Sequence, residues 1–132
     1  MKTISSRGFT LVELLVVVAI IGILAAVGTV SYTGYISGTK QKSIENAMQQ
    51  ISLAQTEEYS NAGEYHTSIT CGDPSETSSK AIEKELFGGG DIITKESGYE
   101  VCIAEEGTSY KIIASNGKKT ITLSANGVWT GK

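Results

Sequence analysis

One long apolar segment near the N-terminus constrains this chain more than any other feature. No residue between Leu14 and Val30 is charged, and the 22 residues from Phe9 to Val30 contain Glu13 as their one charged side chain. A helix rises about 1.5 Å per residue, so a segment of this length covers a hydrocarbon core of about 30 Å. The segment therefore predicts a helix that spans a membrane.

The residues around this segment predict its orientation, and the chain length limits the size of the domain beyond it. Lys2 and Arg7 precede the segment, and the positive-inside rule then places the N-terminus in the cytoplasm and the remainder outside. The chain has 132 residues and a formal net charge of -3. About a hundred residues remain beyond the segment, which is enough for one small domain and leaves no room for a second.

Glu13 is the unusual residue of the segment. An unpaired carboxylate inside a bilayer costs about 3 kcal/mol, so it indicates a function unless it lies in the interfacial region at the helix end. A plain membrane anchor leaves Glu13 unexplained. A cleaved secretory signal could use the small residues of Ala26-Val27-Gly28, but such signals have an apolar region of about 7 to 15 residues without an acid.

The residues flanking Glu13 carry a resemblance to a known family. The string GFTLVELL, which starts at Gly8, continues as VVVAIIGILAA, and together they closely resemble the N-terminus of type IV prepilins, which the pseudopilins of type II secretion share. The resemblance implies that Met1 to Gly8 is a leader peptide. It also implies that a prepilin peptidase cleaves between Gly8 and Phe9 on the cytoplasmic side and methylates the new N-terminus of Phe9.

The same resemblance implies a role for Glu13 in assembly. Cleavage would create a cationic amine on Phe9, four residues before Glu13, and the family pattern implies that Glu13 pairs with the Phe9 amine of a neighbouring subunit. A subunit without this carboxylate would bury an unpaired cation, which costs about 3 to 5 kcal/mol. The protein is then expected in the inner membrane before assembly and in an extracellular pilus afterwards.

The periodicity beyond Val30 predicts that the helix continues to about Asn61. Apolar and aromatic residues recur near helical spacing and are expected to pack on a following sheet: Tyr32, Tyr35, Ile36, Ile44, Ala47, Met48, Ile51 and Ala54. Polar residues are expected on the other faces: Lys40, Lys42, Glu45, Gln49 and Gln50. The helix would thus have a transmembrane half, residues 9–30, and an amphipathic half, residues 31–61, with Gly63 ending it.

Residues 62–97 are expected to form a connecting region with one short helix. Asp73 is expected to cap this helix, with Pro74 in its first turn and Glu76 completing a capping box. The helix is expected to end at Phe87 because Gly88-Gly89-Gly90 follows. Its inward-facing residues would be Ile82, Leu86 and Phe87.

The pattern of residues 98–132 predicts an antiparallel β-meander of three to four strands. Apolar and polar residues alternate in three runs, which are Tyr99–Ala104, Tyr110–Ala114 and Thr120–Ser124. Asn116-Gly117 is a strong hairpin signal, and a final segment follows at Val128-Trp129. The meander can cover the apolar stripe of the long helix, so the expected fold class is α+β.

The two cysteines, Cys71 and Cys102, both follow the apolar segment. An even count in a part of the chain outside the cytoplasm suits a disulfide. Two buried free thiols are the alternative.

No set of residues predicts catalysis, a cofactor or a metal site. His66 is the only histidine, and no nucleophile, base and orienting group can be assembled around it, so it is expected in a surface loop. The acids Asp73, Asp91 and Glu96 match no calcium loop motif. The chain is therefore not expected to be an enzyme.

DNA is disfavoured as a partner. Without the leader the chain holds 11 - 2 = 9 basic residues against 14 acids, a net charge of -5, and that field repels DNA. A local basic patch could still form from Lys111, Lys118 and Lys119, although lysines also protect the exposed edges of sheets.

The resemblance implies a structural subunit of a type IV pilus, a major or minor pilin that polymerises for adhesion, twitching motility or DNA uptake. Its expected partners are other pilin subunits, the prepilin peptidase, the pilus assembly machinery and the inner membrane. Two alternatives remain open, a pseudopilin of a type II secretion system and a DNA-binding minor pilin that acts in competence.

Overall fold

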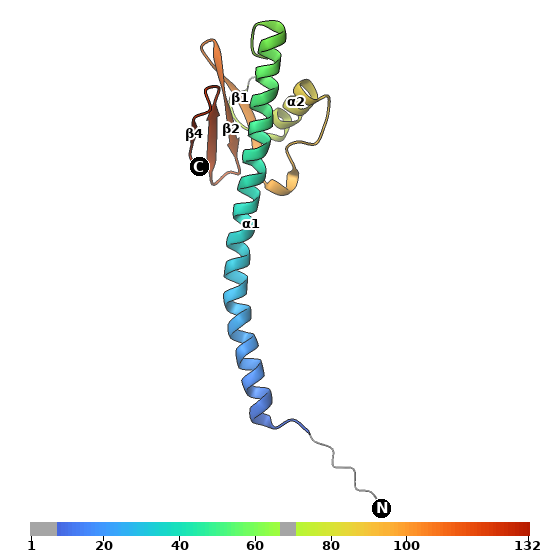
Figure 1. Cartoon of the computed structure of the whole chain (residues 1–132), viewed down its shortest axis with the longest axis vertical. Helices are drawn as coiled ribbons and strands as arrows, with labels where there is room; N and C mark the ends of the chain where they lie inside the picture. The colour runs from blue at the N-terminus through green and yellow to red at the C-terminus, as the bar shows by residue number, and fades with distance from the viewer. Residues whose placement is uncertain (1–7, 67–70) are drawn as a thin grey trace, which may run out of the picture. The chain divides into compact units, whose positions relative to one another are not determined.

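The computed structural model describes residues 8–66 and 71–132. Helix α1, Leu11–Ala62, is one continuous helix (Figure 1). The chain divides into two compact units, Met1–Gly38 and Thr39–Lys132.

The first unit consists mainly of the apolar part of α1. By length and composition α1 is the one helix in the described part of the chain that could cross a membrane. The apolar side chains of this part are exposed, from Leu11 at 87% to Val30 at 75%. Such a surface needs lipid or other apolar chains around it, so the prediction of a long apolar helix is confirmed.

Tyr32 and Tyr35 do not pack on a sheet as the periodicity predicted. Their side chains are 66% and 71% exposed, whereas Met48 is fully buried. The buried residues of α1 begin only at Ile44. Helical spacing reports which residues share a face of a helix, and it does not report how far along that face a partner extends.

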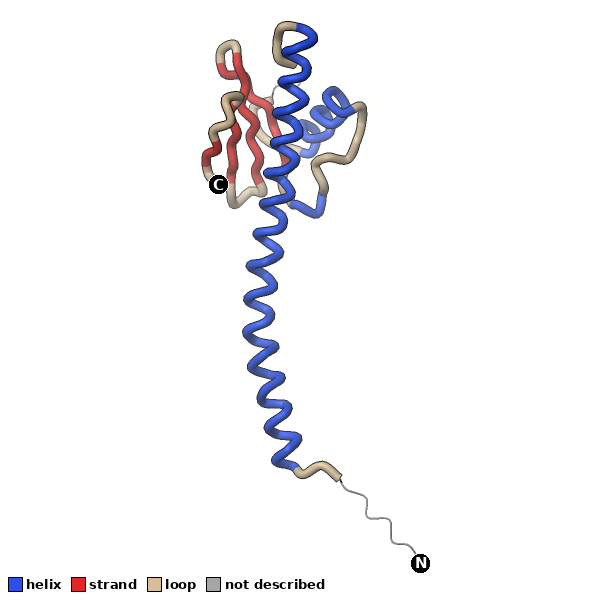
Figure 2. Tube along the Cα trace, viewed as in Figure 1, coloured by secondary structure: helices blue, strands red, loops and turns tan. Residues whose placement is uncertain are grey.

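In the second unit, residues 39–62 of α1 lie against a four-stranded antiparallel sheet (Figure 2). The strands are β1 (Glu100–Glu106), β2 (Ser109–Ser115), β3 (Thr120–Ser124) and β4 (Trp129–Thr130), in the spatial order β1-β2-β3-β4. This arrangement confirms the predicted α+β architecture of a long helix on a small meander.

The core of the second unit joins one face of α1 to one face of the sheet. On α1 the buried residues Ile44, Ala47, Met48 and Ile51 follow the i, i+3, i+4, i+7 pattern. Ile82 from the short helix joins this core, and the strands and the segments before them supply the other members: Ile93, Tyr99, Val101, Ile103, Tyr110, Ile112, Ala114, Ile121 and Leu123. The predicted alternation is therefore confirmed in β2 and β3, whereas in β1 Cys102 is buried together with Val101 and Ile103.

Helix α1 ends as predicted. Its last residue is Ala62, and Gly63 follows with φ +79°, a conformation that glycine adopts without a steric penalty. The Gly63 N–H donates to the Tyr59 carbonyl oxygen at 2.9 Å. This bond satisfies one of the carbonyl groups left free at the end of a helix.

The prediction for the start of the short helix was wrong. Helix α2 is Glu76–Phe87, and its N-cap is Ser75 instead of Asp73. The Ser75 hydroxyl accepts from Ser78 N at 3.1 Å, and Ser75 N donates to Ser78 Oγ at 2.9 Å. Glu76 is left to pair with Lys80 and Lys95, because a reciprocal serine cap already satisfies the helix start.

The end and the inner face of α2 agree with the prediction. Gly88 is the C-cap with φ 68°, and its N–H donates to the Glu83 carbonyl oxygen. Ile82 is fully buried, and Leu86 and Phe87 pack against the core while partly exposed.

Helix α2 also covers the outer edge of the sheet. Ser78 Oγ donates to the Val101 carbonyl oxygen at 2.6 Å, and Val101 N donates to Ser79 Oγ at 2.9 Å. Strand β1 is the edge strand on this side of the sheet. The two serines therefore occupy backbone groups that an exposed edge would offer to another strand.

The disulfide between Cys71 and Cys102 is formed, with the two Cα atoms 5.7 Å apart. The alternative of two free thiols is therefore wrong. Cys71 N also donates to the Ile103 carbonyl oxygen at 3.1 Å. Together these contacts attach the segment before α2 to β1.

Glu45 was expected on an outer face of α1 and is in fact buried, with 5% of its surface exposed. Its carboxylate accepts hydrogen bonds from Gln41 Nε2 at 2.9 Å and Lys42 Nζ at 3.0 Å, and Lys132 Nζ lies 3.9 Å away. A carboxylate can be buried when cations and donors compensate its desolvation. The sequence pattern did not reveal Lys132, which comes from the other end of the chain.

The Glu45 carboxyl is expected to make unfolding depend on pH. Burial alone would raise its pKa, but the hydrogen bonds from Gln41 and Lys42 and the charges of Lys132 and Lys42 outweigh burial and lower the pKa below its usual 4.5. A group whose pKa is lower in the folded state stabilises the fold above the pKa of the unfolded state. This contribution is lost as the pH falls through the folded pKa.

We therefore expect the free energy of unfolding of the detergent-solubilised chain to fall between pH 6 and pH 3, and to fall less in the Glu45→Gln variant. Denaturant titrations followed by circular dichroism at several pH values measure this difference. Glu96→Gln, at an exposed position, is the matched control and should behave like the wild type. Equal pH dependence in Glu45→Gln and the wild type would contradict the assignment.

Candidate functional site at the start of the long helix

The first turn of α1 is closed by a reciprocal pair of hydrogen bonds. Thr10 N donates to Glu13 Oε2 at 3.1 Å, and Glu13 N donates to Thr10 Oγ1 at 3.2 Å. This is a capping box, in which the side chains at the N-cap and three residues later satisfy free backbone N–H groups of the helix start. Glu13 thus has a local partner within its own chain.

Sequence reasoning identified Glu13 but missed Thr10. The pattern Thr-x-x-Glu before an apolar run is the signal of a capping box, and residues 10–13 read Thr-Leu-Val-Glu. The negative charge of Glu13 also lies at the positive end of the helix dipole, which stabilises it.

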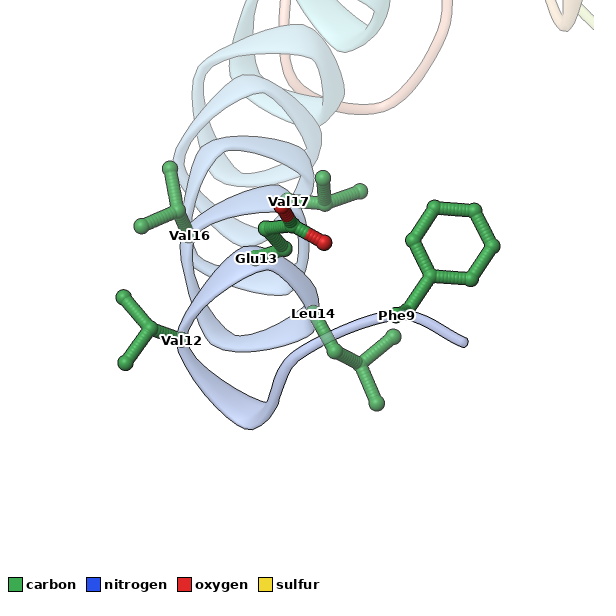
Figure 3. A pocket seen from close by; sticks show the side chains of 6 residues that line it. All are labelled: Phe9, Val12, Glu13, Leu14, Val16 and Val17. Atoms are coloured by element: carbon green, nitrogen blue, oxygen red, sulfur yellow. The ribbon is translucent and has the colours of Figure 1, made fainter. Parts of the chain in front are cut away.

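The carboxylate of Glu13 lies in an open hollow on the apolar surface. The hollow has a volume of about 760 Å³ and is lined by Phe9, Val12, Glu13, Leu14, Val16 and Val17. Figure 3 shows the Glu13 side chain with Val12 and Val16 on one side and with Phe9, Leu14 and Val17 on the other. Glu13 is the one charged residue of this lining, so the hollow suits a group that is apolar and carries a positive charge.

The predicted cleavage point lies just outside α1. Gly8 and Phe9 precede the first helical residue, and the Phe9 side chain is 92% exposed. An exposed, non-helical peptide bond can enter a protease active site. Phe9 N is joined to Gly8 in this chain, so a cationic amine at Phe9 arises only after cleavage. The other leader residues, Met1 to Arg7, lie outside the described residues.

His66 is more tightly held than a surface loop residue. Its backbone N donates to Gln55 Oε1 at 2.9 Å, and its carbonyl oxygen accepts from Gln55 Nε2 at 3.2 Å. Gln55 is fully buried, and sequence reasoning missed it because polar residues on an amphipathic helix are normally read as exposed. The His66 Nε2 atom lies 3.7 Å from Glu85 Oε2.

The structure separates the three lysines of the candidate basic patch. Lys119 lies in the β2–β3 turn and donates from Nζ to Gln41 Oε1 at 2.7 Å, and Lys118 is exposed beside it. Lys111 lies farther along β2, opposite Ala104 and Ser124. Within residues 8–66 and 71–132, no three His, Cys, Asp or Glu side chains gather to form a metal site.

Comparison with known proteins connects this helix to a family. Residues 4–29 match the model of the prokaryotic N-terminal methylation motif. Two fimbrial proteins of Pseudomonas aeruginosa are each 29% identical over 97% of this chain and 86% of their own length. The type IV major pilin protein PilA of Myxococcus xanthus is 38% identical over 46% of this chain and 27% of its own length.

No solved structure gives a significant match to this chain. The similarity to fimbrial proteins nevertheless runs through both the apolar segment and the folded domain, and the methylation motif covers the start of α1. For these reasons the chain is similar to the type IV pilins and other fimbrial proteins, and it carries their N-terminal methylation motif at residues 4–29.

Proposed function

We propose that this chain is a subunit of a type IV pilus and polymerises through the apolar part of α1. The observation that carries the proposal is the exposed apolar surface from Phe9 to Val30. A soluble protein rarely exposes so large an apolar surface. Lipid would cover it before assembly, and the helices of other subunits would cover it in the filament.

Processing would prepare the subunit for this assembly. Prepilin peptidase would cleave between Gly8 and Phe9 and methylate Phe9, since the methylation motif spans residues 4–29. The inner membrane would hold the precursor with its N-terminus in the cytoplasm, as the positive-inside rule predicts. The pilus assembly machinery would then transfer the subunit to an extracellular filament.

Glu13 would pair with the Phe9 amine of a neighbouring subunit. The capping box uses Glu13 Oε2, and the carboxylate has a second oxygen to offer. The box also holds the side chain in one place, which lowers the entropy lost when a partner binds. The hollow around Glu13 can take the apolar ring of an incoming phenylalanine together with its charge.

Adhesion or twitching motility is a better-supported role for the filament than DNA uptake. The chain without its leader would carry a net charge of -5, from 9 basic residues and 14 acids. Lys111 is also separated along β2 from the turn with Lys118 and Lys119. Phosphate contacts dominate the affinity of proteins for DNA. Because the lysines are dispersed and the protein is acidic overall, these features disfavour DNA binding.

Mass spectrometry of sheared surface filaments tests the proposal. We expect filaments whose subunit begins at Phe9 and carries one N-terminal methyl group. The Gly8→Leu variant should accumulate as an uncleaved precursor in the membrane, because a bulky side chain blocks close approach of the protease. Gly8→Ala, which replaces the same residue by another small one, is the control and should still be cleaved.

Three results would contradict the proposal. A mature protein that begins at Met1 would exclude leader removal, and one that begins beyond Gly28 would identify a cleaved secretory signal. Loss of type II secretion upon deletion of the gene, with surface filaments unchanged, would identify a pseudopilin instead.

A further inference from the structure

Apart from the buried Glu45, the charged residues of residues 39–62 of α1 and of the two turns that join β1, β2 and β3 are separated along the direction of α1. Residues 39–62 of α1 carry Lys40 and Lys42 near one end and Glu57 and Glu58 near the other. The sheet likewise carries lysines at one end and glutamates at the other. The β2–β3 turn carries Lys118 and Lys119, and β1 ends at the β1–β2 turn with Glu105 and Glu106.

Hydrogen bonds between α1 and the sheet show that like charges lie at the same end. Lys119 Nζ donates to Gln41 Oε1 at 2.7 Å, which places the β2–β3 turn beside the start of this part of α1. At the other end, the hydroxyl oxygens of Ser52 and Tyr110 are 3.0 Å apart. Tyr110 is the second residue of β2, so the β1–β2 turn lies towards the end of α1 (Figure 1).

The acidic end contains a pocket with aromatic walls. The pocket has a volume of about 510 Å³ and is lined by Tyr59, Gly63, Glu64, Tyr65 and residues 107–109. The Tyr59 and Tyr65 ring centroids are 4.8 Å apart, and Tyr65 contacts Tyr110 at 4.7 Å. Ring faces beside a carboxylate attract an ammonium group by cation–π and ionic interactions.

No cation from residues 8–66 or 71–132 lines this pocket. Glu64 lines the pocket, and four further acids lie within two positions of a lining residue in the sequence: Glu57, Glu58, Glu105 and Glu106. None of these five acids forms an ion pair with another described residue. The basic side chain nearest to this end on the sheet is Lys111, which alternates with the buried Tyr110 and Ile112 and so points to the opposite face of the sheet. The pocket therefore suits a cation from another molecule.

The β2–β3 turn presents such a cation at the opposite end. Lys118 is exposed and forms no ion pair within the described residues, whereas Lys119 is held by Gln41. Asn116 Oδ1 accepts from the backbone N of Lys118 at 2.9 Å and of Lys119 at 2.7 Å. The backbone of the turn is thus held in one conformation before any partner binds, which reduces the entropy cost of docking.

We propose that Lys118 of one subunit docks into the pocket of Tyr59, Glu64 and Tyr65 on a second copy of this chain. Two different surfaces meet in this contact, so it is heterologous and can repeat without closing, as a filament requires. Gln41 and Tyr59 are separated by 59 - 41 = 18 residues of helix, which corresponds to about 27 Å. Subunits in contact would therefore be displaced by about this distance along α1.

The contact rests on the proposed function, and charge reversal in the full-length protein tests it. Glu64→Lys and Lys118→Glu should each lower the yield of sheared filaments about fivefold, as expected for one partly desolvated ion pair with a ring contact. The double variant restores opposite charges and should recover most of the wild-type yield. Glu96→Lys and Lys84→Glu, at exposed positions outside the pocket and the turn, should leave the yield unchanged.

A cross-linking experiment tests the same contact by geometry. Filaments of a Glu64→Cys, Lys118→Cys double variant should form ladders of disulfide-linked subunits after mild oxidation, and either single variant should not. The native bridge does not interfere, because Cys71 and Cys102 are already paired.

The outcomes separate the two proposals. Normal wild-type filaments, with full yield in both single charge reversals and no ladder in the double cysteine variant, would overturn this contact and leave the proposed function standing. Absence of filaments from the wild type would overturn the proposed function and this contact with it.

Discussion

Replacement of Glu13 by valine is expected to leave the protein membrane-bound and cleaved, and to lower the filament yield at least about a hundredfold. The proposed partner of Glu13 is the cationic N-terminus of a neighbouring subunit. Without the carboxylate that cation would be buried unpaired, at a cost of about 3 to 5 kcal/mol per subunit. Each 1.4 kcal/mol changes an equilibrium constant about tenfold, and the penalty recurs at every subunit added.

The capping box provides the control that this experiment needs. Glu13→Gln keeps a side chain that can accept from Thr10 N but removes the negative charge. Thr10→Val removes the hydroxyl that accepts from Glu13 N and keeps the charge. If charge pairing drives assembly, Glu13→Gln should fail like Glu13→Val, and Thr10→Val should assemble with at most a severalfold loss.

The opposite result would assign Glu13 a different role. Normal filament yield in Glu13→Gln, together with a large loss in Thr10→Val, would mean that Glu13 acts by capping α1 alone. Quantitative immunoblots of the sheared fraction, normalised to the membrane fraction, measure both effects. Cleavage of each variant is checked by mass.

Reduction of the Cys71–Cys102 disulfide is expected to lower the free energy of unfolding of the second unit by about 3.5 to 4 kcal/mol. The two cysteines are 31 positions apart, and the chain-entropy model gives this value for a ring of that size. For a domain of fewer than 100 residues the loss corresponds to a fall in Tm of about 15 to 25 °C. Thermal unfolding of the detergent-solubilised chain with and without reductant measures it.

The location of the ring predicts which part of the fold loosens first. Residues 71–102 include all of α2, so amide exchange should accelerate more in α2 than in residues 44–55 of α1. A Cys71→Ser, Cys102→Ala variant should match the reduced wild type, which excludes an effect of the reductant itself. A loss below about 1 kcal/mol, or uniform acceleration in both helices, would contradict the assignment.

Local patterns predicted most of the secondary structure. The run of uncharged residues after Glu13 predicted the apolar part of α1, and Gly63 predicted its end. Alternation in residues 99–124 predicted three strands, and the final segment predicted at Val128-Trp129 corresponds to β4. Side-chain periods of 3.6 and 2.0 are properties of neighbouring residues, so they can be read without knowledge of the fold.

The start of α2 shows where such reading fails. Asp73-Pro74 and Ser75 are overlapping capping signals, and each is sufficient for a helix start. Ser78 and Ser79 form hydrogen bonds to the backbone of Val101. The local capping signal at Asp73 contains no information about these two bonds. A contact with β1, more than 20 residues away, therefore decides among local choices of similar energy.

The candidate site was predictable in part. Glu13 was identified from its charge in an apolar surrounding, and the Thr10 cap was readable from the sequence although it was missed. The hollow around Glu13 and the exposure of Phe9 became visible only in the structure. The burial of Glu45 and Gln55 was not predicted, because Gln55 bonds to the backbone of His66 and Lys132 adds to the local partners of Glu45 only in the folded chain.

The amino-acid sequence by itself determined the elements of this protein: an apolar helix with one acid in its first turn, a helix stop at Gly63, and alternating strands joined by tight turns. Tertiary structure alone decided which polar groups are buried, which serine caps α2, and which lysines meet at one end of the sheet. The physical reason is the range of the interactions. Backbone periodicity and capping act within a few residues, whereas desolvation of a polar group depends on partners that only the folded chain brings near.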